Sequence, residues 1–375
     1  MSHRILAFVG SVALAAAAWS LTPQGVSAQA PKPGAPQSAV PRTADGHPDF
    51  TGMYDVSTMT PLQRPPEFGN RLTLTAEEAN ALEQYEETRY QKDRAPIQGE
   101  KPPPPVGGDK STPRSFLETL FRAGGGAVGG YNLVWLNPGS RVITINGQKR
   151  TSIVVDPPDG KIPAMTPEAR KKMAAFLAYA VSPDAAEGGA GGPAGTYDGP
   201  EARPLAERCL LGFGSTSGPP ALPNYFYNNL KQIVQTRDSV MIQNEMVHDA
   251  RVIRIGGQHL PKDVKSWMGD SIGHWEGDTL VVDTTNFTDK TKFQGSGENL
   301  HVIERFSRLD AKTLLYRFTI EDPTTWERPW TGEYPWVGTD QIMYEYACHE
   351  GNHALENVLR GARVGDASRG AAKPQ

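Results

Sequence analysis

Cysteine and long apolar stretches are both scarce in this chain. Two cysteines, Cys209 and Cys348, lie 139 positions apart among 375 residues. This excludes a disulfide-dense scaffold, and no pair of C-x-x-C motifs is present to build a structural zinc site. The uncharged apolar stretch from Ile5 to Trp19 is shorter than the roughly 20 residues that a membrane helix needs. We therefore expect no membrane span.

The chain also lacks an excess of basic residues and the common cofactor motifs. It has 38 Lys and Arg against 42 Asp and Glu, a net charge of −4, and no basic run stands out. A nucleic-acid partner is therefore not expected, because such proteins carry a basic patch or stripe. No P-loop, dinucleotide fingerprint or H-E-x-x-H motif is present. We expect no cofactor and no metal.

The N-terminus has the pattern of a secretory signal peptide over residues 1–28. Arg4 provides the positive start, the apolar stretch follows, and the small residues of VSAQA allow cleavage after Ala28 or Ala30. The pattern predicts a periplasmic or secreted protein. Its mature form would carry 37 basic and 42 acidic residues.

An exported chain meets an oxidising compartment, which favours a disulfide between Cys209 and Cys348. The alternative is a catalytic thiol at Cys348 with His349 as its base. Adjacent residues on a strand point to opposite faces, so this pair is poorly placed for such a role. We expect the disulfide.

Helix signals are few. A capping box at Thr75 and Glu78 predicts a helix that continues to about residue 91. Further helices are predicted over 112–122 and 166–180. The Pro/Ala-rich residues 29–45 are expected to form an extended or disordered leader, and residues 364–375 a disordered tail.

Strand patterns dominate the rest of the chain. The segments expected as strands are 131–136, 141–147, 149–156, 231–236, 239–255, 278–287, 300–309, 313–322 and 340–349. From Lys231 onward only short turns separate them, with no helix between. We predict a mainly β fold, an antiparallel meander closed as a lipocalin-like barrel or folded as a sandwich. One domain over 46–363 would carry peripheral helices and Gly/Pro-rich loops.

The longest predicted strand supplies the first candidate site. Alternation places Glu245 and Arg251 on one face and Asn244 and His248 on the other. Ionisable groups among apolar residues suit a partly wet barrel lumen, where Glu245 and His248 would act as acid and base. Arg251 and Asn244 would bind the substrate. The alternative is a solvated outer face with a surface ion pair between Asp249 and Arg251.

A second candidate site lies in LHVIERFSR. Glu304 falls in an apolar stripe, and burial raises a carboxyl pKa unless a cation compensates, as in general acids. Arg308 shares the face of Glu304, so a structural ion pair is the competing explanation. His301 points to the opposite face, so His301 and Glu304 are not both expected to face the lumen.

Aromatic residues form a third group. Trp275 precedes a predicted strand, and Trp326 lies in TTWERPWTGEYPW, which its prolines mark as a long loop. Around a barrel mouth such side chains stack on sugars or aromatic ligands. They are equally suited to plugging the ends of the barrel.

Several long phrases resemble a family of exported bacterial proteins of uncharacterised function. They are GHWEGDTLVVDTTNFTDKT, ENLHVIERFSR, FTIEDPTTWERPWT and YEYACHEGN, together with the opening TADGHPDFTGMYD that leads into a first strand. The resemblance extends from about Thr43 to Arg363 and implies a single β-rich unit. It implies no catalytic residue.

Three functions remain open from the sequence. The first is a periplasmic enzyme, a hydrolase, lyase or isomerase, that uses acid–base chemistry on a small polar, glycosidic or aromatic compound inside the barrel. The second is a non-catalytic carrier of a small apolar or aromatic ligand. The third is a structural envelope protein with the leader as its tether. Convergent ionisable groups in the lumen would favour the enzyme.

Overall fold

The computed structural model describes residues 40–94, 139–180, 197–212, 218–224, 227–291 and 293–371. All of them belong to the unit Ser38–Gln375. The predicted signal peptide, most of the leader, the helix expected at 112–122 and the strand expected at 131–136 lie outside the described residues.

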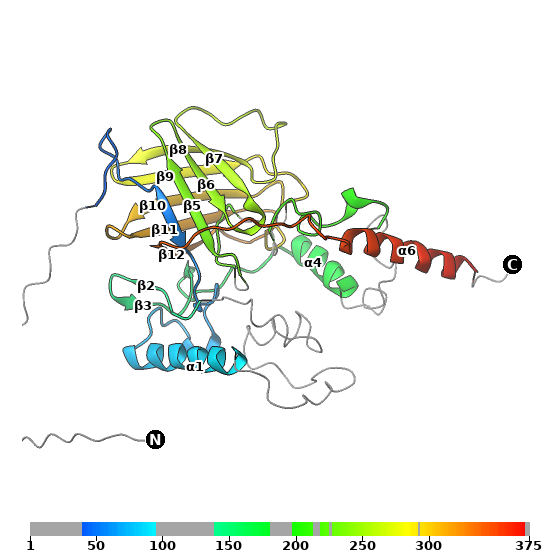
Figure 1. Ribbon diagram of the computed structural model, residues 1–375, viewed down its shortest axis with the longest axis horizontal. Helices are drawn as coiled ribbons and strands as arrows, with labels where there is room; N and C mark the ends of the chain where they lie inside the picture. Colours follow the sequence, from blue (N-terminus) through cyan, green and yellow to red (C-terminus); the bar gives the residue numbers. More distant parts are fainter. Residues whose placement is uncertain are drawn as a thin grey trace, which may run out of the picture. The chain divides into compact units, whose positions relative to one another are not determined.

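A closed β-barrel forms the centre of this unit (Figure 1). Its strands pair in the order β1-β5-β6-β7-β8-β9-β10-β11-β12, and β1 pairs with β5 on one side and with β12 on the other. β4 adds to β12 outside this ring. The mainly β class and the barrel are therefore confirmed, and the sandwich alternative is not what the chain adopts. The barrel strands are β1 (Gly52–Asp55), β5 (Leu230–Gln235), β6 (Ser239–Asn244), β7 (Ala250–Ile255), β8 (Asp270–Glu276), β9 (Thr279–Thr285), β10 (His301–Arg308), β11 (Thr313–Glu321) and β12 (Trp330–Gly338).

One pair of neighbours departs from an antiparallel meander. β7 and β8 run parallel, with Ile253 opposite Ser271. Parallel neighbours need a connection of about a dozen residues or more, and residues 256–269 provide it. The start of this connection is held to β8 by a hydrogen bond from Gly256 N to Gly273 O, 2.7 Å long.

Two strand predictions near the C-terminus were wrong. The segment expected to be a Pro-punctuated loop contains β12, and residues 340–347, expected as a strand, have no regular structure. Pro335 is tolerated because β12 pairs with β4 at Thr331 and Gly332 and with β1 only from Val337 onward. The missing N–H of Pro335 falls between these two pairings. With β1 paired to β5 and to the end of β12, residues 340–347 continue beyond the ring without pairing as a strand.

The long strand predicted over 239–255 was also wrong as a single element. β6 ends at Asn244 and β7 begins at Ala250, and the residues between them form the β6–β7 turn, which contains the short helix η4 (Met246–His248). Val247 and His248 have φ values of 64° and 56°. This left-handed backbone reverses the chain, so alternation does not carry across the turn.

Smaller elements surround the barrel. The two-stranded ribbon of β2 (Thr144–Ile145) and β3 (Gln148–Lys149) turns at Asn146-Gly147, a dipeptide typical of tight hairpins. β4 is Val154–Asp156, and the short helices η1 (Pro66–Phe68) and η3 (Pro200–Ala202) lie in loops.

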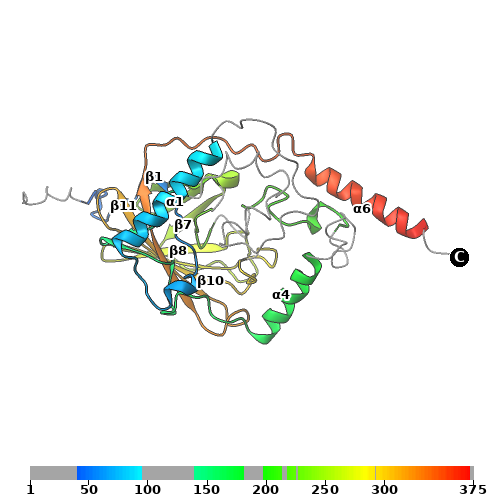
Figure 2. The same cartoon turned by 90° about the horizontal axis from the view of Figure 1, so that it is seen from below.

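Three longer helices complete the described structure. α1 (Ala76–Arg94) begins at the predicted capping box, in which Glu78 N donates to Thr75 Oγ1 at 3.1 Å. α4 (Pro167–Ala180) matches the helix predicted at 166–180. α6 (Ala354–Ala371) was not predicted and runs past residue 363, where we expected a disordered tail (Figure 2). Among the described residues, no helix is long and apolar enough to cross a bilayer.

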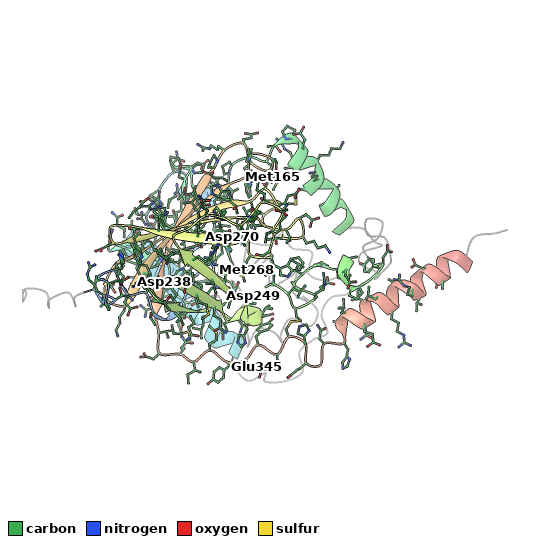
Figure 3. The ribbon with its side chains drawn as sticks, turned by 90° about the horizontal axis from the view of Figure 1, so that it is seen from above. Met165, Asp238, Asp249, Met268, Asp270 and Glu345 are labelled. Atoms are coloured by element: carbon green, nitrogen blue, oxygen red, sulfur yellow. A yellow bond between two sulfur atoms is a disulfide. The ribbon has the colours of Figure 1, made fainter. Side chains whose placement is uncertain are left out.

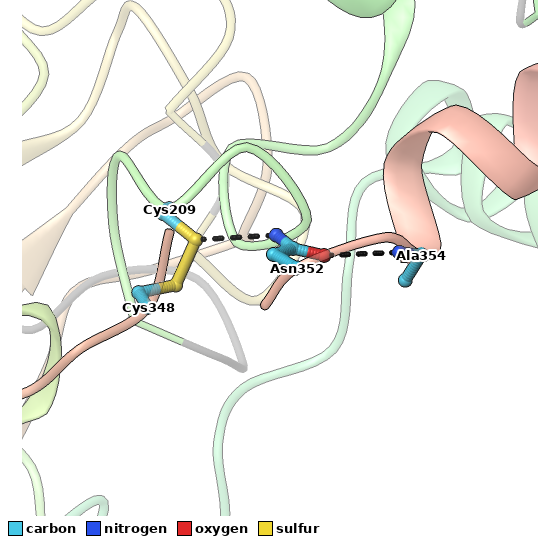
Figure 4. Close-up of a disulfide and its surroundings, with 4 residues drawn as sticks. All are labelled: Cys209, Cys348, Asn352 and Ala354. Atoms are coloured by element: carbon cyan, nitrogen blue, oxygen red, sulfur yellow. Dashed lines mark hydrogen bonds between the residues drawn. A yellow bond between two sulfur atoms is a disulfide. The ribbon is translucent and has the colours of Figure 1, made fainter. Parts of the chain in front are cut away.

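The predicted disulfide is present. Cys209 and Cys348 are bonded, with their Cα atoms 5.8 Å apart (Figure 4). Asn352 donates to Cys209 Sγ at 3.6 Å and accepts from Ala354 N at 3.2 Å, at the start of α6. The disulfide therefore attaches the segment after β12 to the loop around Cys209.

Candidate functional site

The lumen of the barrel is defined by alternating buried residues on its strands. On β10, Val302, Glu304 and Phe306 are buried, while the residues between them are partly exposed. The wall formed by β10, β11 and β12 is rich in aromatic rings. The buried aromatic side chains of these strands are Phe306, Tyr316, Phe318, Trp330, Tyr334 and Trp336. Most of the lumen is therefore apolar.

A set of polar side chains interrupts this apolar lining, and we call it the lumen polar cluster. All its members share a strand face with buried apolar residues, as Lys231 does with Ile233 and Arg251 with Ile253. The members are Lys231, Asn244, Arg251, Ser271, Thr284, Glu304 and Tyr316.

Arg251 and Glu304 form an ion pair across the lumen. Arg251 donates to both carboxylate oxygens of Glu304, at 2.5 and 2.7 Å, and its side chain also reaches Ser271 Oγ at 3.3 Å. The two side chains are 5% and 0% exposed. Because β8 and β9 separate β7 from β10, the pair ties non-adjacent walls together. Its two-pronged geometry satisfies both buried charges.

Tyr316 extends this network to a loop. Its hydroxyl donates to Glu304 Oε1 at 2.7 Å and accepts from Ala221 N at 2.9 Å. The hydroxyl of Tyr334 in turn donates to Ala221 O at 2.6 Å. Burial raises the pKa of Tyr316 well above its usual value, so the phenol stays protonated and remains a donor to Glu304. Both carboxylate oxygens of Glu304 therefore have donors, and the buried pair links β7, β10 and β11.

Lys231 differs from the rest of the cluster. Its side chain is fully buried, and among the described residues its Nζ has no hydrogen-bond partner. Burial lowers its pKa from 10.5 to about 7, although the negative charges of Asp249 and Glu245 act in the opposite direction. At neutral pH a large share of the amine is therefore uncharged and nucleophilic.

Asn244 lies directly across from Lys231 in the pairing of β5 with β6. Its side chain is also buried, and among the described residues its Oδ1 has no donor. A buried polar atom without a partner is rare in folded proteins. Two of them on directly paired residues mark this end of the lumen as a place where polar atoms of a ligand would be satisfied.

The β6–β7 turn follows Asn244 directly. Asp249 at the end of the turn is labelled in Figure 3, as is Asp238, which precedes β6. Glu245 is bonded twice to Leu230, the neighbour of Lys231: its N donates to Leu230 O at 3.0 Å, and its Oε2 accepts from Leu230 N at 3.1 Å. A β-branched residue such as Val247 seldom adopts positive φ. Backbone strain of this kind clusters at functional sites.

The first predicted acid–base pair lies in the β6–β7 turn. Glu245 and His248 lie in the turn and not on a strand, and His248 Nε2 is 2.7 Å from Tyr344 O. Their expected places on a strand were wrong, because the turn interrupts the alternation. Arg251 and Asn244, the predicted ligand-binding residues, are both buried on the lumen side. A surface ion pair of Arg251 with Asp249 is not what forms.

His301 and Glu304 lie on opposite faces of β10, as alternation predicts. His301 is outside, where its two ring nitrogens contact Asp283 at 2.8 Å and Glu321 at 3.0 Å. The hydrogen bond to Asp283 is the largest cause that raises the pKa of His301. His259 bonds the same Asp283 and also Asp270. Among the described residues, no group of three or more such side chains is arranged to hold a metal ion.

The two predicted aromatic residues lie in different surroundings. Trp275 stacks on His47 with ring centroids 4.2 Å apart and packs against the core beside Phe50. Trp326 is buried against Phe293 and Trp330. Both contacts are those expected of side chains that plug a barrel.

Comparison with protein-family models, with curated proteins and with solved structures finds no match for this chain. The proposed function therefore depends on the geometry alone, and the resemblance to an exported bacterial family stays a prediction.

Sequence reasoning missed Lys231 as a site residue. A signal was present, since Lys231 precedes Ile233 by two positions at the start of a predicted strand and so shares its face. Its meaning depends on Asn244 lying opposite, and that register is a property of the folded barrel.

Proposed function

We propose that this chain is an enzyme that uses acid–base chemistry on a small compound inside the barrel, with Lys231 as the proton acceptor. The observation that carries the proposal is the buried amine of Lys231 opposite the buried Oδ1 of Asn244, both without a hydrogen-bond partner in the described parts of the chain. A general base works best when its pKa is near the operating pH, and that of Lys231 is about 7. Exported function in an oxidising compartment is supported by the disulfide.

The chemistry that suits a lone amine base is removal of a proton from carbon, the first step of an elimination or isomerisation. The apolar lining excludes water and strengthens electrostatic interactions with the reacting atoms. Asn244 Oδ1 would accept a hydrogen bond from a hydroxyl or N–H of the substrate. Arg251 and Glu304 would hold the wall on which these groups lie.

A proton-exchange assay tests this function. The full chain is incubated in D2O with a panel of ketones, hydroxy acids, esters and lactones, and solvent deuterium entering the substrate is followed by 1H NMR. We expect exchange that rises with pH through about 7, as the amine loses its proton. Lys231→Met should abolish it, and Lys262→Met, at an exposed lysine, should not. Equal exchange by wild type and Lys231→Met would contradict the proposal.

The carrier remains a second candidate because of one observation. The indole N–H groups of Trp326, Trp330 and Trp336 have no hydrogen-bond partner among the described residues. Buried donors in an aromatic wall suit a bound aromatic ligand with acceptor atoms. Stoichiometric binding of panel compounds without any exchange or turnover would favour the carrier.

A further inference from the structure

We infer that Lys231 forms a Schiff base with an aldehyde or ketone, so that its lone pair attacks carbon in place of accepting a proton. The inference rests on the proposed site at Lys231 and narrows its substrate to carbonyl compounds. The juxtaposition that carries it is a buried Nζ and a buried amide oxygen on directly paired residues of β5 and β6, neither of which has a hydrogen-bond partner among the residues that the structure describes. Amine nucleophiles that form Schiff bases are activated by desolvation of this kind.

The surroundings of Lys231 leave its lone pair available. The charges of Asp249 and Glu245 act on it electrostatically, and within the part of the chain that the structure describes no hydrogen bond holds its proton. The positive charge of Arg251 also disfavours the protonated amine. A lysine that binds an anion has to stay protonated, which the positive charge of Arg251 opposes.

The state of Arg251, whose positive charge acts on Lys231, argues against a carboxylate as the preferred substrate. Arg251 is already neutralised by Glu304 through two short hydrogen bonds. It therefore offers no free charge to a second carboxylate. A neutral carbonyl carbon, which needs a nucleophile and not a counter-ion, suits the amine better.

Asn244 has a specific place in the reaction. Attack by Nζ on the carbonyl carbon gives a carbinolamine, whose new hydroxyl and N–H are both donors. Asn244 Oδ1 can accept from either one. In the attack one amine proton passes to the carbonyl oxygen. The C–O bond of the carbinolamine then breaks, the hydroxyl leaves with the remaining N–H proton as one water, and a C=N double bond joins the lysine to the substrate. Asn244 is a positioning residue in this scheme.

Reductive trapping tests the inference. The full chain is incubated at pH 7 with benzaldehyde or with 2-butanone and then reduced with sodium borohydride, which converts an imine into a stable secondary amine. Intact mass and peptide mapping locate the adduct. We expect about tenfold more label at Lys231 than at the exposed Lys262, since burial favours the neutral nucleophile. Lys231→Met should remove that label, and Lys262→Met should leave it in place.

Asn244→Leu provides a second variant in case the first alters folding. It leaves Lys231 in place and removes the acceptor Oδ1, together with the Nδ2 that donates to Asp249 O at 3.3 Å. Trapping at Lys231 should slow about tenfold, the effect of one lost hydrogen bond to the reacting atoms. Trapping that is unchanged in Asn244→Leu would overturn the role of Asn244.

Two results separate this inference from the proposed function. If Lys231 takes no label while deuterium exchange still depends on it, the Schiff base is wrong and Lys231 is a general base only. If label appears at exposed lysines as fast as at Lys231, the inference is wrong as well. If neither exchange nor trapping depends on Lys231, the proposed function fails together with it.

Discussion

At the scale of single residues, the buried amine of Lys231 couples the stability of the barrel to pH. Its pKa is about 7 in the folded chain against 10.5 for the exposed side chain. Between these values the unfolded chain binds one more proton, so the free energy of unfolding rises with pH. From pH 7 to pH 10 we expect wild type to gain about 3 to 4 kcal/mol relative to Lys231→Met.

Urea unfolding at several pH values measures this difference, with Lys262→Met as the control at an exposed site. The control should follow wild type at every pH. A difference between wild type and Lys231→Met that does not change with pH would show that the amine is protonated in the folded barrel.

The ion pair between Arg251 and Glu304 makes a second residue-scale prediction. Arg251→Met should lower the free energy of unfolding by about 3 to 5 kcal/mol, because it leaves the fully buried Glu304 without its cation. Adding Glu304→Gln should restore most of the loss, because a neutral amide still accepts from Tyr316. A double-mutant cycle by urea unfolding gives the coupling, and additive losses would contradict the pairing.

The sequence predicts the burial of Glu304 but not its partner. The apolar stripe around Glu304 predicted its burial, as a general acid or, in the competing explanation, as the partner of Arg308 on the same face. The partner is instead Arg251, 53 residues away. Arg308 bonds Asp49 O and Ala311 O, and Arg305 pairs with Glu276 outside. Alternation gives the face of a side chain, and only barrel closure decides which distant strand lies across from it.

At the scale of elements, the β6–β7 turn stores strain beside Lys231. Val247 has φ 64° and ψ 0°, a conformation that glycine adopts at little cost. Val247→Gly should raise the free energy of unfolding by about 1 kcal/mol, since relief of 1 to 3 kcal/mol of strain exceeds the added flexibility of glycine. Thermal and urea unfolding measure the gain.

Val252→Gly on the neighbouring strand β7 is the matched control. Val252 is exposed and has ordinary strand geometry, so glycine there should destabilise the chain. If Val247→Gly destabilises as much as Val252→Gly, the turn is not strained. If it stabilises and also slows trapping at Lys231, the strain contributes to the site.

The sequence patterns predict the interiors of most strands and fail at some of their boundaries. β5, β9, β10 and β11 match predicted strands because each has a clear alternation and a turn at both ends. β6 and β7 were merged because MVH contains none of the usual turn residues. β12 was taken for a loop because of its prolines. A proline fits in a strand only where no neighbouring strand needs its N–H, and the sequence does not give the pairing of β12.

At the scale of the whole molecule, β1 closes the barrel with four paired positions on β5 and two on β12. It also contributes the buried ring of Tyr54 to the core. A chain that starts at residue 57 would lack it and expose the edges of β5 and β12, and such edges pair with other chains. We therefore expect that chain to aggregate or unfold.

A chain that starts at residue 40 keeps β1 and is the matched control. It should be monodisperse by size-exclusion chromatography and retain the β-type circular dichroism and thermal transition of the full chain. The two chains differ by 17 residues, which include the four residues of β1 and the buried side chain of Phe50. If the chain from residue 57 also folds with the same transition, β1 is dispensable and the barrel holds together as an open sheet.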